Sequence, residues 1–197
     1  MQTQSTIFAD SVATIPCTWT EKTLSKLESK TDKRYELVNG EPKEKISGGI
    51  GHSYIAITVG GELGNHALSQ KLGVTLESSA CYRMRSGNIL KPSVSFVAKD
   101  RLTEKRLSTK AFEGAPDLAV EVISPTDIWW EIMQKLDEYF SSGCRLVWLI
   151  SPLDQRVLVY RQEQRNQILE LGDLLDGEEV VPGFSMPVAD LFAEFDF

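Results

Sequence analysis

Cysteine and histidine are scarce in this 197-residue chain. The three cysteines, Cys17, Cys81 and Cys144, are far apart and form no Cys-x-x-Cys pair, which argues against a disulfide framework and against a thiolate zinc site. The two histidines, His52 and His66, lie about 21 Å apart if one helix carries both, so they cannot hold the same ion. Any bound metal is therefore expected to be a hard cation with oxygen ligands.

Long apolar runs are also missing. No stretch approaches the roughly 20 residues that a membrane-spanning helix requires. The first 16 residues lack the basic start and the continuous apolar segment of a secretory signal. We therefore expect a cytoplasmic protein without a membrane partner. The length and a hydrophobic share of 42% suit one domain. We place this domain at residues 20–197, after an N-terminal extension at residues 1–19.

Positive charge is in deficit overall, with a formal net charge of -7. That balance argues against a protein that coats nucleic acid indiscriminately. The charges are unevenly distributed, because residues 1–110 carry 16 Lys and Arg against 11 Asp and Glu, whereas residues 111–197 carry 5 against 17. The densest basic segment is residues 99–106. It is compatible with a phosphate-bearing partner, and equally with a solvated charged loop.

Local signals predict a mixed sheet flanked by helices, an α/β (α+β) fold. Thr20 can cap the first helix, and Asn39-Gly40 is a strong hairpin signal. The expected helices are residues 21–29, 52–72, 124–142 and 188–194. The expected strands are residues 35–41, 74–84, 89–98, 117–123, 145–150, 157–161 and 168–171, followed by a turn at 181–184.

Two of these helices show an apolar stripe with a four-residue spacing. In the helix at 52–72 the stripe consists of Ile55, Val59, Leu63 and Ala67. In the helix at 124–142 it consists of Ile128, Ile132, Leu136 and Phe140. Ser124 followed by Pro125 resembles a helix start, with Asp127 three residues after the cap. The two helices are therefore expected to cover the sheet.

Glu121 is the most conspicuous candidate for chemistry. It lies in an otherwise apolar strand of the kind that is buried on both faces of a sheet. An ionised carboxylate there is costly unless it is paired or bound to a metal. Two interpretations stay open at this stage: an ion pair with a nearby Arg or Lys, or a functional carboxylate. Removal of the charge by Glu121→Ala is expected to leave the fold intact or more stable.

Lys135 and Ser93 are less distinctive by themselves. Lys135 could form an ordinary exposed pair with Glu131 at a spacing of i,i+4, worth a few tenths of a kcal/mol. Ser93 follows Lys91 on the predicted strand at 89–98, and alternation puts both on one half-exposed face. A small polar residue there has no necessary function.

Taken in order, several segments resemble a large bacterial family of restriction-endonuclease-like proteins, long catalogued as a domain of unknown function. The resemblance covers about residues 20–195. The segments that carry it are Tyr35-Glu36-Leu37-Val38-Asn39-Gly40-Glu41, His52, Lys91-Pro92-Ser93-Val94-Ser95-Phe96, Ala115-Pro116-Asp117-Leu118-Ala119-Val120-Glu121-Val122-Ile123-Ser124-Pro125, Lys135 with Tyr139, Val147-Trp148-Leu149-Ile150 and Val181-Pro182-Gly183-Phe184.

The resemblance implies a PD-(D/E)XK fold and Mg²⁺- or Mn²⁺-dependent cleavage of DNA phosphodiesters. Glu121 would bind the metal together with the Val122 carbonyl. Lys135 would orient the attacking water and stabilise the pentacovalent charge, with Tyr139 lining the same site. Glu41 and His52 match further positions that look functional, as an extra metal ligand and as a phosphate or water contact. A homodimer is implied by analogy only.

The chain departs from the family pattern at Ser93, where the family has Asp after proline. A neutral hydroxyl is a weaker ligand and supplies one negative charge fewer, so affinity for Mg²⁺ should fall. Lys91 on the same face should oppose cation binding further. Two functions follow: a weakened metal-dependent endonuclease, or an inactive nuclease-fold protein that binds DNA or protein. A third interpretation, an α+β domain without nuclease ancestry, is disfavoured by the ordered motifs.

Overall fold

A computed structural model describes residues 19–46, 48–102, 110–162 and 166–192. The predicted irregular segment at 1–18, the second half of the basic segment at 99–106 and the end of the last predicted helix lie outside these residues. The elements, in chain order, are α1 (Glu21–Thr31), β1 (Tyr35–Val38), β2 (Glu41–Glu44), α2 (Gly49–Ser69), β3 (Gly73–Glu77), β4 (Tyr82–Arg83), β5 (Ile89–Leu90), β6 (Val94–Ala98), η1 (Lys99–Arg101), β7 (Phe112–Glu113), β8 (Leu118–Val122), α3 (Trp129–Ser141), β9 (Leu146–Ser151), β10 (Arg156–Arg161), β11 (Gln167–Leu169), β12 (Leu174–Asp176), β13 (Ser185–Pro187) and η2 (Val188–Leu191).

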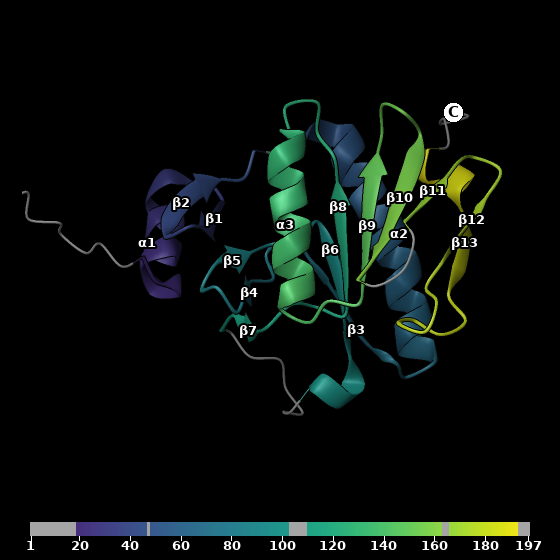
Figure 1. Ribbon diagram of the computed structural model, residues 1–197, viewed down its shortest axis with the longest axis horizontal. Coiled ribbons are helices and arrows are strands. Elements are labelled where there is room, and N and C mark those ends of the chain that lie inside the picture. Colours follow the sequence, from purple (N-terminus) through teal and green to yellow (C-terminus); the bar gives the residue numbers. More distant parts are fainter. Residues whose placement is uncertain (1–18, 47, 103–109, 163–165, 193–197) are drawn as a thin grey trace, which may run out of the picture.

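The central layer is a six-stranded mixed sheet in the order β11-β10-β9-β8-β6-β3 (Figure 1). β8 and β9 run parallel and are joined through α3, a βαβ unit, whereas the other neighbours in this sheet are antiparallel. A five-stranded sheet in the order β2-β1-β5-β4-β7 lies to one side and packs with α1, and β12 pairs with β13. The expected mixed α/β architecture is confirmed.

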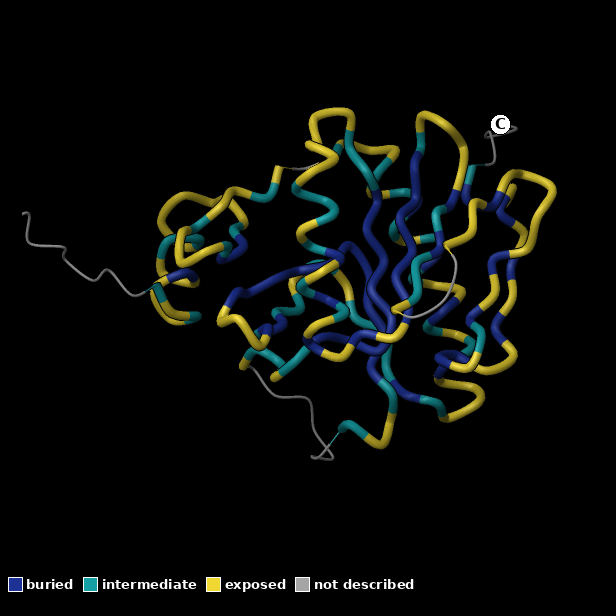
Figure 2. The backbone as a smooth tube through the Cα atoms, in the orientation of Figure 1, coloured by how far each residue is buried: buried dark blue, intermediate teal, exposed yellow. Residues whose placement is uncertain are grey.

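The two long helices cover opposite faces of the six-stranded sheet. The α2 stripe predicted from the sequence is buried and packs with Val120, Val122 and Trp148 on one face. Leu136 and Tyr139 of α3 pack with Ala119 and Val147 on the other. The middle strands are consequently dark blue in Figure 2, buried on both sides. Because side chains alternate along β8, Glu121 projects to the α3 face.

Two predicted strands are each divided between the two sheets. The strand predicted at 74–84 becomes β3 and β4, separated by a turn in which the Ala80 N–H donates to the Glu77 carbonyl (3.0 Å). The strand predicted at 89–98 becomes β5 and β6, with Pro92 between them. Proline has no N–H for a ladder hydrogen bond, so pairing is interrupted there. This division brings the small sheet beside the end of the large one.

The third predicted helix begins later than its sequence suggests, at Trp129 instead of Ser124. The Ser124 N–H donates to the Asp127 carboxylate (2.8 Å) and the Asp127 N–H to the Ser124 carbonyl (3.0 Å), which closes a turn ahead of the helix. Ile128 is 59% exposed, and it is Leu136 and Tyr139 that are buried. The apolar stripe predicted for this helix was therefore wrong at Ile128, its first residue.

The other local predictions made from the sequence agree with the structure at the start of α1 and at the first hairpin. Thr20 caps α1 in a reciprocal pair of hydrogen bonds with Thr23, and Asn39 and Gly40 turn β1 into β2 with φ values of 53° and 81°. The last predicted helix is a 3₁₀ turn, η2, over its described residues. No helix in the described ranges is long and apolar enough to span a membrane.

Candidate functional site

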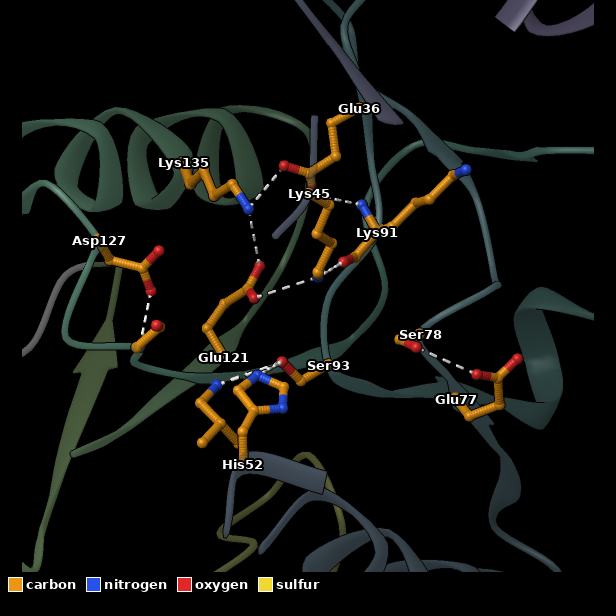
Figure 3. Close-up of polar contacts among 12 residues, drawn as sticks. Glu36, Lys45, His52, Glu77, Ser78, Lys91, Ser93, Glu121, Asp127 and Lys135 are labelled. Carbon is orange, nitrogen blue, oxygen red and sulfur yellow. Dashed lines mark hydrogen bonds and ion pairs between the residues drawn. The ribbon is translucent and has the colours of Figure 1, made fainter. Parts of the chain in front are cut away.

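A cavity of about 140 Å³ lies between the small sheet, the end of β8 and the start of α3. Five of the residues singled out in the sequence line it: His52, Ser93, Glu121, Val122 and Lys135. They come from four separate parts of the chain, which the fold brings together (Figure 3). The remaining lining residues are Glu36, Lys43, Glu44, Lys45, Ile46, Ile123, Ser124, Thr126, Asp127, Ile128, Glu131 and Ile132.

Glu121 lies at the centre of a polar network, near the carboxyl end of β8. The Tyr139 hydroxyl donates to its Oε1 atom (2.7 Å). The ammonium groups of Lys135 and Lys45 lie 3.6 Å from Oε1 and 3.8 Å from Oε2, respectively. Glu121 as a whole is 9% exposed. Burial of this charge is thus offset by two cations and a hydroxyl donor, as the ion-pair interpretation of the sequence expected.

Lys135 does not form the ordinary surface pair with Glu131. Its ammonium group lies 2.7 Å from Glu36 Oε2 and bridges this carboxylate to Glu121. Glu131 instead pairs with Lys43. Burial alone lowers the pKa of Lys135, but the attraction of Glu121 and Glu36 outweighs it and raises this pKa above its usual range. Lys135 therefore stays protonated at neutral pH and can stabilise negative charge, but cannot serve as a base.

Glu36 is a site residue that sequence reasoning quoted in a motif without assigning it a role. It is 3% exposed, and its Oε1 atom accepts the Lys91 N–H (2.8 Å). Burial alone raises the pKa of this carboxyl, yet Lys135, Lys45 and these hydrogen bonds lower it below the ordinary value. The available signal was a charged residue next to Leu37 in a short strand, too weak to distinguish it from surface glutamates.

This network predicts a pH window for stability. The lowered pKa of Glu36 stabilises the fold above the unfolded-state value, about 4.3, and this contribution is lost as pH falls through the folded-state pKa. The raised pKa of Lys135 stabilises the fold below about 10.4, and this contribution is lost only as pH rises through its folded-state pKa. Urea unfolding between pH 3 and 7 should show a steeper acid loss for wild type than for Glu36→Gln; equal slopes would contradict the pairing.

Ser93 lies between Val122 and His52. Its hydroxyl oxygen accepts the Val122 N–H (3.3 Å) and lies 3.4 Å from His52 Nε2. Ser93 is 3% exposed, so the half-exposed face predicted for it was wrong. Burial, followed by the charge of Lys45, lowers the pKa of His52, which keeps the imidazole neutral at pH 7. His52 is therefore able to exchange a proton, while Ser93 contributes no charge.

Tyr139 and Glu41 have different surroundings. Tyr139 is fully buried, and burial together with the charge of Glu121 raises its pKa well above the usual value, so it acts as a neutral hydrogen-bond donor. Glu41 is exposed in β2 and lines an adjoining cavity of about 530 Å³, which it shares with Lys43, Glu131 and Lys135. Glu41 thus lines the adjoining cavity and not the one that holds Glu121.

Lys91 requires a correction. The sequence placed its side chain on the face of Ser93, where it would oppose a cation. In the structure its ammonium group contacts the Glu28 carboxylate (2.5 Å), and Figure 3 shows the side chain directed away from Glu121. β5 ends at Leu90, so the alternation assumed for one continuous strand does not reach this residue. Lys45, which had no sequence signal, is the cation that joins Lys135 beside Glu121.

The donor set does not fit a preformed divalent metal site. Over the part of the chain that the structure describes, no three His, Cys, Asp or Glu side chains are grouped so that they could hold a metal ion. Mg²⁺ in proteins commonly binds one or two carboxylates and keeps several waters. Here Glu121 already contacts two ammonium groups, and Ser93 is neutral.

Comparisons with known proteins agree with this geometry at the level of fold and family. One similar solved structure, described as a putative nuclease belonging to DUF820 from Anabaena variabilis ATCC 29413, superposes with a TM-score of 0.73 at 21% identity, covering 82% of this chain and 91% of that chain. At this identity the likeness shows the fold alone, a mixed α/β architecture. A search of curated proteins found no match.

A comparison of the sequence with family models identifies the family. A family model described as "Uma2: Putative restriction endonuclease" matches residues 22–189. The chain belongs to this family, and the resemblance noted from its motifs is confirmed.

Proposed function

We propose that this chain is a DNA endonuclease of its family whose metal-dependent cleavage is strongly weakened. One observation carries the proposal: Glu121 and Lys135 meet in a cavity at the end of β8, while neutral Ser93 stands beside the Val122 N–H where the family pattern has Asp. The pairing of a buried carboxylate with a lysine supports a phosphodiester site, and the missing carboxylate accounts for weak use of Mg²⁺ or Mn²⁺.

The side chains supply distinct functions in this proposal. Protonated Lys135 stabilises the negative charge that develops on the oxygens of the attacked phosphate group. Neutral His52 exchanges a proton with water or with a phosphate oxygen. Tyr139 fixes the orientation of Glu121 through its hydrogen bond. Glu41 lines the adjoining cavity, where it can reach an extended substrate.

The rim of the cavity also suits a nucleic acid. Ile128 lines the cavity, and the next two residues, Trp129 and Trp130, are 51% and 68% exposed at the start of α3. Exposed aromatic rings offer surfaces on which bases can stack, at roughly 1–3 kcal/mol per base. DNA is accordingly the proposed partner, with a homodimer and a single domain at residues 20–197 as further proposals.

A second function is favoured by one specific observation, the charge balance of the site. Glu121 is paired with Lys45 and Lys135, so the chain's own lysines balance the charge of this carboxylate. A protein that binds DNA or another protein and does not cleave would retain such a network. This interpretation differs from the first in one measurable property, the turnover of DNA.

Plasmid nicking by the purified chain distinguishes these functions. Slow nicking of supercoiled DNA is expected in Mn²⁺ and Mg²⁺, abolished by chelation and by Glu121→Gln, which keeps the side-chain size and an acceptor for Tyr139. DNA binding should persist in that variant. If wild type binds DNA but nicks neither supercoiled nor single-stranded substrate, the non-cleaving function replaces the first. Undiminished nicking by Glu121→Gln would remove Glu121 from the site.

A further inference from the structure

Lys45 occupies an unusual position in the cavity. It follows β2, and its ammonium group lies 3.8 Å from Glu121 Oε2 and donates a hydrogen bond to the Lys91 carbonyl. Its side chain is 16% exposed. A carboxylate oxygen together with a backbone carbonyl oxygen is the kind of ligand pair that a hard divalent cation uses. In this chain both of those oxygens lie next to the Lys45 ammonium group.

The Lys45 ammonium group balances the charges of the network formed by Glu36, Glu121 and Lys135. Glu36 pairs with Lys135 and Glu121 contacts both Lys135 and Lys45, so two carboxylates face two cations. Ser93 adds no charge. The cavity is also lined by Asp127, Glu44 and Glu131, but a divalent ion entering beside Glu121 would meet the two ammonium groups that already contact this carboxylate. Repulsion between like charges in a largely buried site is strong.

We propose that the Lys45 ammonium group stands in for the metal ion at Glu121, as an internal cation that suits the loss of the carboxylate at position 93. This inference rests on the proposed function, because it takes the Glu121 cavity to be the phosphodiester site. The ligand class it implies is the phosphodiester anion: Lys45 and Lys135 contact phosphate oxygens directly, and binding needs no divalent ion.

Lys43 provides a matched control two residues away. It lines the same cavity, but it pairs with Glu131, and its side chain is 45% exposed against 16% for Lys45. Removal of either lysine changes the net charge of the chain equally. Only removal of Lys45 vacates the place beside Glu121.

The deciding experiment is a titration of the full chain with Mn²⁺ by calorimetry, in the absence of DNA. Lys45→Met is expected to bind Mn²⁺ at least about tenfold more tightly than wild type, because one repelling charge next to Glu121 is removed. Lys43→Met should stay within about twofold of wild type, since exposed charges are well screened. Equal Mn²⁺ affinity in wild type and folded Lys45→Met would overturn the proposal, as would an equal gain in Lys43→Met. If Lys45→Met does not fold, Lys45→Gln is read by the same criteria.

A second readout uses single-stranded DNA binding in chelator. Wild-type affinity should be unaffected by removal of divalent ions, whereas Lys45→Met should lose roughly tenfold and recover when Mn²⁺ is added. Lys43→Met should show no such recovery, and recovery there to the same extent counts against the proposal. A wild-type chain that does not bind DNA refutes the proposed function, while the Mn²⁺ titration still decides the role of Lys45.

Discussion

Ser93→Asp is expected to bind Mn²⁺ and Mg²⁺ at least about tenfold more tightly than wild type and to nick plasmid DNA faster. The position is well suited, because the Ser93 hydroxyl lies beside the Val122 N–H and His52, at the wall of the cavity that holds Glu121. A carboxylate at position 93 would supply a second charged metal ligand beside the Glu121 carboxylate.

The same substitution should carry a cost in stability without metal. Residue 93 is 3% exposed, so an ionised Asp is buried and only partly compensated by the Val122 N–H. A lower melting temperature in chelator, recovered by Mn²⁺, is therefore expected, because a ligand that binds only the folded state stabilises it. Ser93→Asn controls for size without charge. A Ser93→Asp variant that binds metal no better than Ser93→Asn would refute the assignment of Ser93 to the site.

Glu121→Ala is expected to lose all cleavage and about 2 kcal/mol of unfolding free energy, the order of an uncompensated buried hydrogen-bond network. Sequence alone suggested the opposite sign for stability, because it showed a buried charge without its partners. The structure supplies those partners: the Tyr139 hydroxyl loses its acceptor, and Lys45 and Lys135 lose the carboxylate between them. Breaking a buried pair on one side leaves the other side unpaired.

Urea unfolding at pH 7 measures this effect. Glu121→Gln should lose less stability than Glu121→Ala, because the amide oxygen still accepts from Tyr139. Tyr139→Phe removes the donor instead, and coupling with Glu121→Gln in a double-mutant cycle would identify their hydrogen bond. If Glu121→Ala unfolds at the wild-type urea concentration, the contacts around Glu121 contribute nothing to stability.

The candidate site was only partly accessible from the sequence. Glu121 stood out because a carboxylate in an apolar strand violates the pattern of its surroundings, and this violation is local. Lys135, His52 and Ser93 were named through the resemblance to a family, since each alone had an ordinary explanation. Lys45 and Glu36 were not recognised as site residues. Their significance depends on distant partners: Lys45 meets Glu121, 76 positions along the chain, and Glu36 pairs with Lys135, 99 positions along.

Sequence by itself determined the elements whose signals are local. The α2 stripe, the Asn39-Gly40 hairpin and the buried strand β8 follow from side-chain periodicity and turn chemistry, which act over a few residues. Tertiary structure decided where strands divide between two sheets, where α3 begins and which lysine meets Glu121. Those outcomes depend on pairing and burial between segments that are far apart in the sequence. A buried carboxylate must be paired with a cation, and the tertiary structure decides which lysine lies close enough to pair with it.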